Sequence, residues 1–426
     1  MGNSTPDAGP ADAAPASVHT FYSEASWIEG AAVDQLHHVA GLNGVRAVAA
    51  FPDLHPGKYG PVGSAILSER VYPPLIGNDI GCGMSLFALD LPARKLRLDK
   101  AAVKLRALEG LWDGDAAGRL VEAGLAPDLH PQALGTIGGG NHFCELQIVD
   151  RVSDVPALAD AGLAEGQLVM LVHSGSRSLG MAVFSDVDQA HAGLAAGSSE
   201  AANYLNRHHD AIAWAELNRQ IIAERAASAL RADLTLIADA PHNMIEAFDG
   251  LYLHRKGAAK ADGGLVPLAG SRDALSYLVR PTGTAPEALA SLAHGSGRKY
   301  DRASMTGRAG ATKSDRRQLE RTSFGGYVVC EDRQLLDGGC SPQAPADLQE
   351  GKGGAGQRRE GTLETRPEKE GESMTSKKDL RLLVTSGDGP RECRRAVALI
   401  LGQMRKEATR RKLTFDETLS DPDAQD

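Results

Sequence analysis

The stretch Pro73–Ser85, PPLIGNDIGCGMS, places Asp79 and Cys82 three residues apart among prolines and glycines. Glycine at this density disfavours a helix interior, because each glycine there costs roughly 1 kcal/mol relative to alanine. It suits a loop whose backbone approaches another group closely. A carboxylate and a thiol on such a loop form half of a candidate metal site. A tight turn with an incidental buried cysteine explains this stretch, taken alone, equally well.

The composition indicates a globular protein with an aliphatic core. The 426 residues are enough for one large domain or for two to three ordinary ones. Hydrophobic residues at 42% and charged residues at 24% are usual for this class, whereas aromatic residues at 4% are sparse. The core must therefore rely on Leu, Val, Ile and Ala. A net charge of −9 argues against wholesale coating of nucleic acid, although an average conceals local patches.

No targeting or membrane segment is expected. No run approaches 18 apolar residues, so the sequence predicts no transmembrane helix. The first residues lack the basic and apolar regions of a secretory signal. Five cysteines are spread widely from Cys82 to Cys393, a pattern that is unlike a disulfide framework and indicates a reducing, cytoplasmic setting.

Apolar spacing predicts an α+β fold of short strands and a few helices. Strands are expected within 45–51, 62–67, 84–91, 168–173, 234–238 and 251–254, and helices over 96–111 and 200–231. No βαβ period or internal repeat is present, which argues against a doubly wound or solenoid architecture. His208 and His209 lie on the longer helix, where histidines are more often packed or solvated than ligands.

Changes in composition divide the chain into four parts. Residues 1–17 are rich in Ala, Pro and Gly and are expected to be a disordered tail, followed by one domain over 18–336. Residues 337–373 have almost no apolar side chains and are expected to be a disordered linker. Residues 374–426 are expected to form a short β-α fragment, with a strand over 380–386 and a helix over 392–412. That fragment is too small to bury a core of its own.

Four histidines share one sequence context, at the end of or within an apolar run and beside Gly, Ser or Asn. They are His142, His173, His242 and His294. Each alone is more often structural, but the repetition indicates groups presented by strand ends and Gly-rich loops. With Asp79 and Cys82 they provide a donor set that suits Mn, Fe or Zn. A thiolate can bridge two ions, and paired divalent ions are a recurrent solution for chemistry at phosphorus.

Three loops combine small residues with an arginine, as phosphate sites do. They are HSGSR at 173–177, AGSR at 269–272 and HGSGR at 294–298. Gly and Ser let backbone amides approach an anion, and arginine supplies a bidentate fork. The window 294–321 holds eight basic side chains against three acidic ones. It is typical of a surface for a polyanionic substrate, and a solvated surface is the alternative.

The motifs together resemble the RtcB RNA ligases. In order they are PDLHPGK, GNDIGCG, GGGNHFCE, HSGSRSLG, PHN, LHRKGA, AGSRDALSY and HGSGRK. The resemblance covers roughly Val18 to Leu336 and implies an RtcB-type domain with Gly-rich active-site loops. The forms HSGSRSLG and GGYVVCEDRQLL look most like the branch coupled to the release-factor-like protein called release factor H.

The resemblance implies a GTP- and Mn-dependent ligase acting in RNA repair. Such an enzyme joins RNA 3′-phosphate or 2′,3′-cyclic phosphate ends to 5′-hydroxyl ends. Carried over by motif, Cys82 would bridge two Mn ions, with Asp79 and His142 completing one site and His173 and His242 the other. His294 would be the nucleophile that takes GMP from GTP, and Asp53 of PDLH would lie near the reacting ends.

A second set of residues is implied to hold the guanylate. It consists of Asn141, His142, Phe143, Cys144, Glu145, Asn243, Ala269, Gly270, Ser271, Arg272, Ser276, His294, Gly295, Ser296 and Gly297. Ala269 stands where the family has proline, a change that we expect to be tolerated. The family is monomeric by default, and its partner is RNA. A link to the ribosome or to release factor H is implied by the branch.

The C-terminal part departs from the family. The family's acidic, proline-containing segment and its final nucleotide-contacting lysine have no counterpart after Leu336. Met374 onward resembles the start of release factor H but lacks its GGQ tripeptide. The simplest hypothesis for both features is a reading-frame shift into an adjacent gene. The departure leaves two further hypotheses open, a catalytically impaired RNA- or ribosome-binding protein and a metal-dependent phosphodiesterase.

Overall fold

The computed structural model describes residues 16–23, 26, 28–187, 191–270, 275–283, 285–295 and 359–366. The chain divides into two compact units, Met1–Gly371 and Glu372–Asp426, and every described residue belongs to the first. The strand and helix expected within 380–412, together with the resemblance to release factor H, lie outside the described residues.

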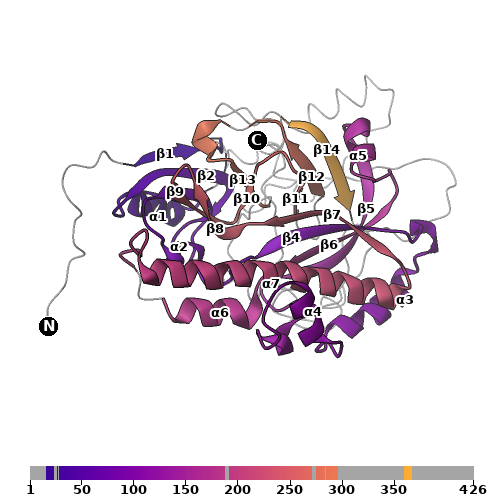
Figure 1. Ribbon diagram of the computed structural model, residues 1–426. Helices are drawn as coiled ribbons and strands as arrows, with labels where there is room; N and C mark the ends of the chain where they lie inside the picture. The colour runs from indigo at the N-terminus through magenta and orange to yellow at the C-terminus, as the bar shows by residue number, and fades with distance from the viewer. Residues whose placement is uncertain are drawn as a thin grey trace, which may run out of the picture. The chain divides into compact units, whose positions relative to one another are not determined.

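One sheet of the first unit has five strands in the order β1-β2-β3-β9-β8 (Figure 1). Their bounds are β1 Ser17–Thr20, β2 Val45–His55, β3 Val62–Ser68, β9 Leu251–Lys256 and β8 Asn243–Phe248. Only β1 and β2 pair in parallel within this sheet; the other neighbours are antiparallel. Helix α1, Gly30–Ala40, covers one face, where its Leu36 and Val39 pack against Val48 and Ile66.

The second sheet has seven antiparallel strands in the order β11-β12-β14-β5-β6-β4-β7. Their bounds are β11 Val266–Leu268, β12 Ser276–Pro281, β14 Arg359–Arg366, β5 Phe143–Val152, β6 Leu168–Ser174, β4 Gly83–Leu89 and β7 Leu234–Pro241. Strand β14 comes from the range 337–373 that was expected to be a linker, and the rest of that range lies outside the described residues. A two-stranded sheet pairs β10, Ala258–Lys260, with β13, Ser291–Ala293.

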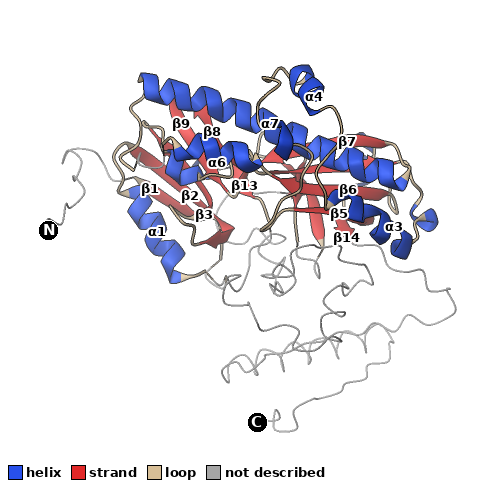
Figure 2. Ribbon diagram, turned by 90° about the horizontal axis from the view of Figure 1, so that it is seen from below, coloured by secondary structure: helices blue, strands red, loops and turns tan. Residues whose placement is uncertain are grey.

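Helix α7, Ser199–Leu230, lies across both sheets (Figures 1 and 2). It begins where the Ser198 side chain accepts a hydrogen bond from the Ala201 amide, as an N-cap residue should. Its apolar face includes Ile222, which packs in one cluster with Met170 of β6. The helix therefore backs the strands whose ends carry the predicted ligands.

The remaining helices are short. They are α2 Pro73–Ile76, α3 Leu98–Leu105, α4 Ala116–Glu122, α5 Val155–Asp160 and α6 Arg177–Ser185, with 3-10 turns η1 Ala93–Lys95, η2 Arg106–Leu108, η3 Pro131–Ala133 and η4 Pro286–Ala288.

The structure confirms the predicted α+β class and corrects some boundaries. The long helix differs from its predicted range 200–231 by one residue at each end. The helix predicted over 96–111 is shorter, because α3 ends at Leu105 and gives way to η2. PPLI, expected to be loop, forms the single turn α2, since proline at a first helical position loses no hydrogen bond. Strand β1 begins at Ser17, one residue before order was expected.

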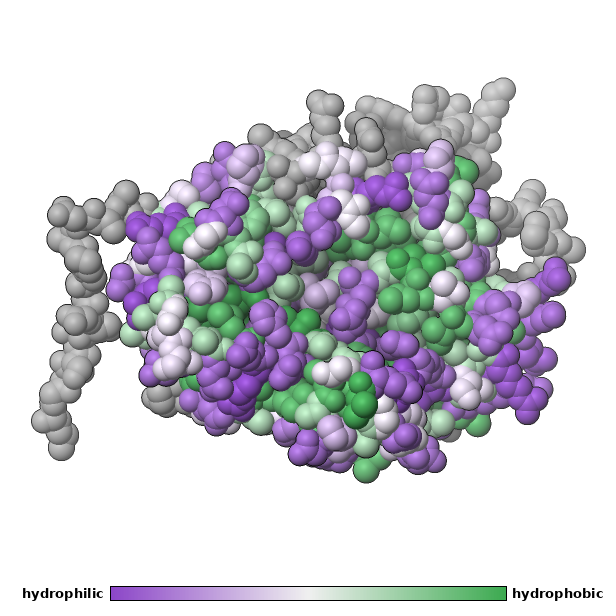
Figure 3. Space-filling model, viewed as in Figure 1, coloured by the Kyte–Doolittle hydropathy of each residue, from purple (hydrophilic) through white to green (hydrophobic). Residues whose placement is uncertain are grey.

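The described surface mixes polar and apolar side chains. On the face shown in Figure 3, hydrophilic residues surround smaller groups of hydrophobic ones. The exposed large apolar side chains are Val103, Leu111, Val121, Val155, Met181 and Leu236. In the part of the chain that the structure describes, no helix is both long and apolar enough to span a bilayer.

Candidate metal centre and active site

The register of the seven-stranded sheet brings four predicted ligands to one edge. Gly83 at the start of β4 pairs with Ser174 at the end of β6 and with Pro241 at the end of β7. Phe143 at the start of β5 pairs with His173. Because these neighbours run antiparallel, the start of one strand meets the end of the next. Cys82, His142, His173 and His242 therefore meet although they are far apart in the sequence.

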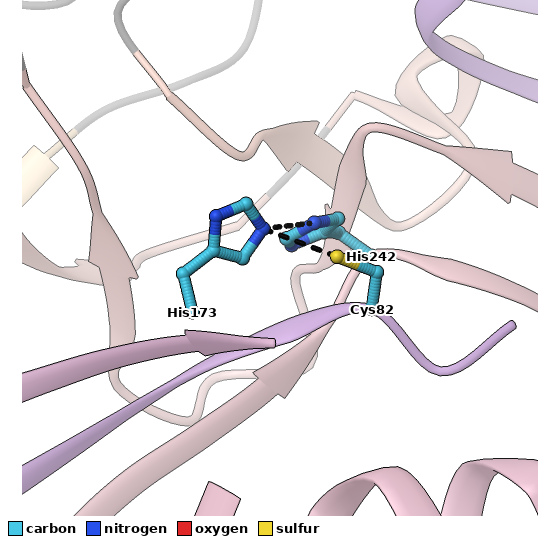
Figure 4. A group of neighbouring side chains, drawn as sticks. All are labelled: Cys82, His173 and His242. Atoms are coloured by element: carbon cyan, nitrogen blue, oxygen red, sulfur yellow. Dashed lines mark hydrogen bonds between the residues drawn. The ribbon is translucent and has the colours of Figure 1, made fainter. Parts of the chain in front are cut away.

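Cys82 lies at the centre of this group. Its Sγ is 3.1 Å from His173 Nε2 and 3.5 Å from His142 Nε2. His173 Nε2 is in turn 3.3 Å from His242 Nε2. Figure 4 marks the contacts of His173 with Cys82 and with His242 by dashed lines. His142 Nε2 lies 2.9 Å from Asp79 Oδ2. Two triads thus share the thiol: Cys82, His173 and His242 form one, and Asp79, Cys82 and His142 form the other.

The donor set and its protonation fit divalent cations. In each triad the potential ligand atoms lie within 4.8 Å of one another. Burial lowers the pKa of His173 and of His242 well below the usual range, so both imidazoles stay neutral, as ligands must be. The Nδ1 atom of His173 lies 2.8 Å from the Asn141 carbonyl oxygen, which assigns the ring proton to Nδ1 and leaves the Nε2 lone pair facing Cys82.

The two remaining ligands carry opposite pKa shifts. Burial, reinforced by Asp79, raises the pKa of the Cys82 thiol well above its usual range, so binding of a cation there must release a proton. Burial alone would raise the pKa of Asp79 as well, but the hydrogen bond and charge of His142 hold it well below the usual range. Asp79 is therefore an anionic donor at neutral pH.

Glycine at position 81 lets the ligand loop pack against α7. Gly81 has φ +69°, and a Cβ there would lie 2.9 Å from Ala215 Cβ and from Ile212 Cα. Its amide donates to the Asn243 carbonyl oxygen at 2.8 Å. A larger residue would push Cys82 away from the histidines. Gly81 thus allows the close approach of the backbone to another group that the glycine-rich sequence predicts.

His294 stands beside the ligands and directly after β13. Its ring centroid is 4.4 Å from that of His242. Its Nδ1 donates to the Gly257 carbonyl oxygen at 2.7 Å, so the lone pair is on Nε2. Oδ2 of the buried Asp53 lies 2.5 Å from the same Nδ1 atom, but the two atoms do not have the geometry of a hydrogen bond. The Asp53 carboxylate therefore acts on the ring as a nearby negative charge. Gly257 has φ +61°, and a Cβ there would lie 3.0 Å from His294 Cε1.

Several predicted nucleotide-binding residues also come together. Gln147 Nε2 donates to Glu145 Oε2 at 2.8 Å and to Ser276 Oγ at 3.1 Å. Ser276 Oγ accepts from the Gly270 amide at 3.2 Å. A parallel bridge between Ala269 and Gly295 joins the AGSR and HGSG loops. The remaining predicted residues of these two loops, Ser271, Arg272, Ser296 and Gly297, lie outside the described residues.

The other predicted nucleotide-binding residues have contacts inside the site. The Asn243 side chain donates to the Asp79 carbonyl oxygen at 3.1 Å and accepts from the Gly257 amide at 2.9 Å. It therefore links the loop that carries Asp79 to the residue whose carbonyl oxygen accepts from His294. The Phe143 ring meets His173 edge-on at 5.4 Å. Cys144 is half-buried, and burial raises its thiol pKa to about 12.

Glu145 makes the stability of the protein sensitive to pH. Burial raises the pKa of its carboxyl from 4.5 to about 7, against the opposing hydrogen bond from Gln147. Between these values the folded chain holds a proton that the unfolded chain releases, so the stabilising contribution is full below about pH 4.5 and is lost as the pH rises through about 7. Urea unfolding of Glu145→Gln should therefore show a smaller loss of stability from pH 5 to pH 8 than the parent.

The exposed Glu165→Gln variant serves as the control for that measurement and should follow the parent at every pH. Parallel curves for Glu145→Gln and the parent would contradict the shifted pKa.

Two charged residues within the quoted motifs support the site: Lys256, for which the sequence predicted no role, and Arg177, the arginine of the predicted HSGSR phosphate loop. Lys256 Nζ donates to the Ile76 carbonyl oxygen at 2.8 Å, and burial lowers its pKa while Asp79 raises it. Arg177 Nη1 lies 3.3 Å from His142 Nδ1, on a backbone with φ +54°. Both residues lie inside the motifs LHRKGA and HSGSRSLG.

Arg219 was also missed, and its helical position was the available signal. It falls in register with Ala215, Ile222 and Ala226, at spacings of three and four residues along one side of α7. A charged residue within an apolar stripe predicts a buried ion pair rather than a solvated one.

His208 and His209 behave as their helical context predicts. His208 is buried and its Nε2 accepts from the Ile245 amide at 3.0 Å, whereas His209 is exposed. Neither belongs to the two triads.

Comparison of the sequence with known proteins shows the family to which the chain belongs. The sequence profile of the family described as tRNA-splicing ligase RtcB matches residues 35–111 and 126–337. The chain is 42% identical over 326 residues to RNA-splicing ligase RtcB2 of Escherichia coli, a match that covers 75% of this chain and 86% of that protein. It is 30% identical over 363 residues to RNA-splicing ligase RtcB of Mycobacterium tuberculosis, covering 63% and 84%.

An archaeal relative, tRNA-splicing ligase RtcB of Archaeoglobus fulgidus, is 29% identical over 374 residues, with 65% of this chain and 78% of the relative covered. The matched residues include both candidate metal-binding triads and His294. The chain therefore belongs to the RtcB family of RNA-splicing ligases.

Proposed function

We propose that this protein is an RNA ligase that uses GTP and Mn²⁺ to join 3′-phosphate or 2′,3′-cyclic phosphate ends of RNA to 5′-hydroxyl ends. The observation that carries the proposal is the position of His294, whose Nδ1 is bonded to the Gly257 carbonyl and whose ring lies against the metal ligand His242. Relatives whose names describe RNA-splicing ligases support the choice of RNA as substrate.

In the first step His294 acts as a nucleophile. Its Nε2 lone pair attacks the α-phosphorus of GTP, an N–P bond forms, and the bond to the β-phosphate breaks to release pyrophosphate. The Gly257 carbonyl fixes the ring proton on Nδ1, and the Asp53 carboxylate stabilises the positive charge that develops on the ring. The protein then carries GMP on His294.

In the later steps the nucleotide activates the RNA end. An oxygen of the RNA 3′-phosphate attacks the GMP phosphorus and releases His294. The 5′-hydroxyl then attacks the 3′-phosphate, a phosphodiester forms, and GMP leaves. A cyclic phosphate is first opened by water to the 3′-phosphate. Divalent cations held by the two triads would neutralise phosphate oxygens and stabilise the leaving groups.

Glu145, Ser276 and Gly270 are the described residues that we assign to the nucleotide. They share one hydrogen-bond network through Gln147, next to the bridge that joins Ala269 to Gly295 and hence to His294. A guanine nucleotide bound there would have its phosphates directed at His294 and the metal triads.

The test uses two RNA strands, one ending in 3′-phosphate and the other beginning with 5′-hydroxyl. With Mn²⁺ and GTP the protein should convert them to a single joined strand, and omission of GTP should abolish joining. A strand ending in 3′-hydroxyl is the control and should stay unjoined.

Two results would overturn the proposal and select another function. Opening of a cyclic phosphate without GTP, and without any joining, would identify a metal-dependent phosphodiesterase, for which the two triads alone suffice. RNA binding with no change to either end would identify a binding protein.

A further inference from the structure

Arg219 connects the elements that carry three metal ligands. This side chain of α7 is fully buried. Its Nη1 donates to the Gly81 carbonyl oxygen at 2.8 Å and to the Ser174 carbonyl oxygen at 3.0 Å. Gly81 directly precedes Cys82, and Ser174 directly follows His173. Its Nε and Nη2 bond both carboxylate oxygens of Asp239, at 2.8 and 2.7 Å, on the strand that leads to His242.

The hydrogen bonds of Arg219 orient the strands around it rather than adding to the stability of the fold. A buried ion pair loses so much hydration that apolar side chains of similar volume often stabilise a fold equally well. The planar guanidinium, in contrast, holds its acceptors at defined angles. Ser85 completes the network by accepting from Arg219 Nε at 2.9 Å and donating to Asp239. One rigid group thereby fixes the positions of β4, β6 and β7 relative to one another at the metal edge, the edge of the sheet where Cys82, His173 and His242 meet.

Arg255 makes a similar set of hydrogen bonds to the segment that precedes His294. It is fully buried on β9, and its Nη1 donates to Glu246 Oε1 at 2.6 Å. Its Nε donates to Ser291 Oγ at 2.7 Å and its Nη2 to the Ala290 carbonyl oxygen at 3.2 Å. These contacts hold the turn from which β13 runs directly into His294.

The turn held by Arg255 is strained. Leu289 and Ala290 have φ of +51° and +46°, a left-handed conformation that costs free energy for residues other than glycine. Such residues persist only where their surroundings hold them in place. Ser291 Oγ donates to the Leu289 carbonyl oxygen at 2.7 Å, and Arg255 holds the next carbonyl along the chain. Release of this turn would let His294 shift.

We propose that Arg219 and Arg255 are separate positioning residues, Arg219 for the metal ligands and Arg255 for the nucleophilic histidine. The inference rests on the proposed function for the role of His294 only. The metal half of the site and the nucleophile half therefore have independent supports, and each arginine variant is a control for the other.

The Arg219 half is tested by metal binding. Arg219→Met should bind Mn²⁺ about tenfold to a hundredfold more weakly than the parent, the usual effect of losing an outer hydrogen-bond partner of a metal site. Its Co²⁺ derivative should show altered ligand-field absorption. Arg255→Met should match the parent in both measurements.

A second variant separates positioning from folding. Arg219→Met/Asp239→Leu removes the uncompensated carboxylate as well as the guanidinium, so it should recover thermal stability while its Mn²⁺ affinity stays low. Arg225→Met is the matched control, because Arg225 also leaves α7 to bond backbone carbonyls, those of Ala107, Gly110 and Gly135, away from the ligands. Parent-like Mn²⁺ affinity in both Arg219 variants would overturn this half.

The Arg255 half is tested at saturating Mn²⁺. Arg255→Met should form the covalent GMP adduct at least tenfold more slowly than the parent at unchanged metal content. Glu246 keeps Lys260 Nζ at 3.4 Å as a second cationic partner, so the variant should fold. Carbethoxylation of His294 by diethyl pyrocarbonate, mapped by mass spectrometry without GTP, should be faster in Arg255→Met than in Arg219→Met. Equal rates in all proteins would overturn this half.

The two readouts also separate this inference from the proposed function. If the parent forms no adduct with GTP, the proposed function fails. The Mn²⁺ titrations and the carbethoxylation rates still decide whether each arginine positions its half.

Discussion

His294→Ala should abolish covalent labelling of the protein by GTP carrying a labelled α-phosphate. We expect a loss of more than about a thousandfold, because removing the nucleophile of a covalent mechanism costs at least that much in other enzymes. The label on the parent should be acid-labile and stable to base, as a bond between phosphorus and an imidazole nitrogen is. Scintillation counting of the protein after acid and base treatment provides the measurement.

His209→Ala is the matched control, since His209 is an exposed histidine of α7 outside the two triads. It should label as the parent does. The His294→Ala protein should also bind Mn²⁺ with parent affinity, because His294 belongs to neither triad. Equal labelling of parent and His294→Ala would rule out His294 as the acceptor of GMP.

Cys82→Ala should remove both metal ions, whereas Asp79→Ala should remove only one. Cys82 is common to both triads, and its Sγ lies 3.1 Å from His173 Nε2 and 3.5 Å from His142 Nε2. Asp79 contacts only the second of these histidines. Elemental analysis after equilibration with Mn²⁺ should give two ions for the parent, one for Asp79→Ala and none for Cys82→Ala.

Cys144→Ala supplies the control for loss of a thiol. Cys144 is the other cysteine among the described residues, and it belongs to neither triad. This variant should retain both ions. Equal losses in Asp79→Ala and Cys82→Ala would show that Cys82 does not bridge.

The sequence predicted those strands and helices that are marked by an apolar run or by helical spacing within their own residues. The apolar run at 168–173 and the helical spacing over 200–231 gave β6 and α7 to within one residue. Short strands such as β10 and β13 were not predicted, because three residues carry no periodicity and the pairing between Ala258 and Ala293 is a tertiary contact. The order of the seven-stranded sheet depends on similar long-range pairings.

The candidate site could be predicted further than the fold around it. Asp79, Cys82 and the histidines lie in short motifs of unusual composition, and the structure brings them together. The support from Arg219 could not be predicted from motifs, since this residue lies outside them and acts through carbonyl groups, which carry no sequence signature. The link from Asn243 to Asp79 was hidden because it too is made to a carbonyl oxygen.

The meeting of distant strand ends at the metal edge has a kinetic consequence. Cys82 and His242 approach one another only after the intervening chain, including β5, β6 and α7, has been synthesised and has folded. Contacts of such long range form late, because the entropy of closing a long loop must be overcome first. A nascent chain that ends before His242 holds every residue of the triad Asp79, Cys82 and His142 but lacks one residue of the other triad. Completion of this second triad therefore follows synthesis of β7, and binding of a divalent cation there during refolding would report a late step of folding rather than the first.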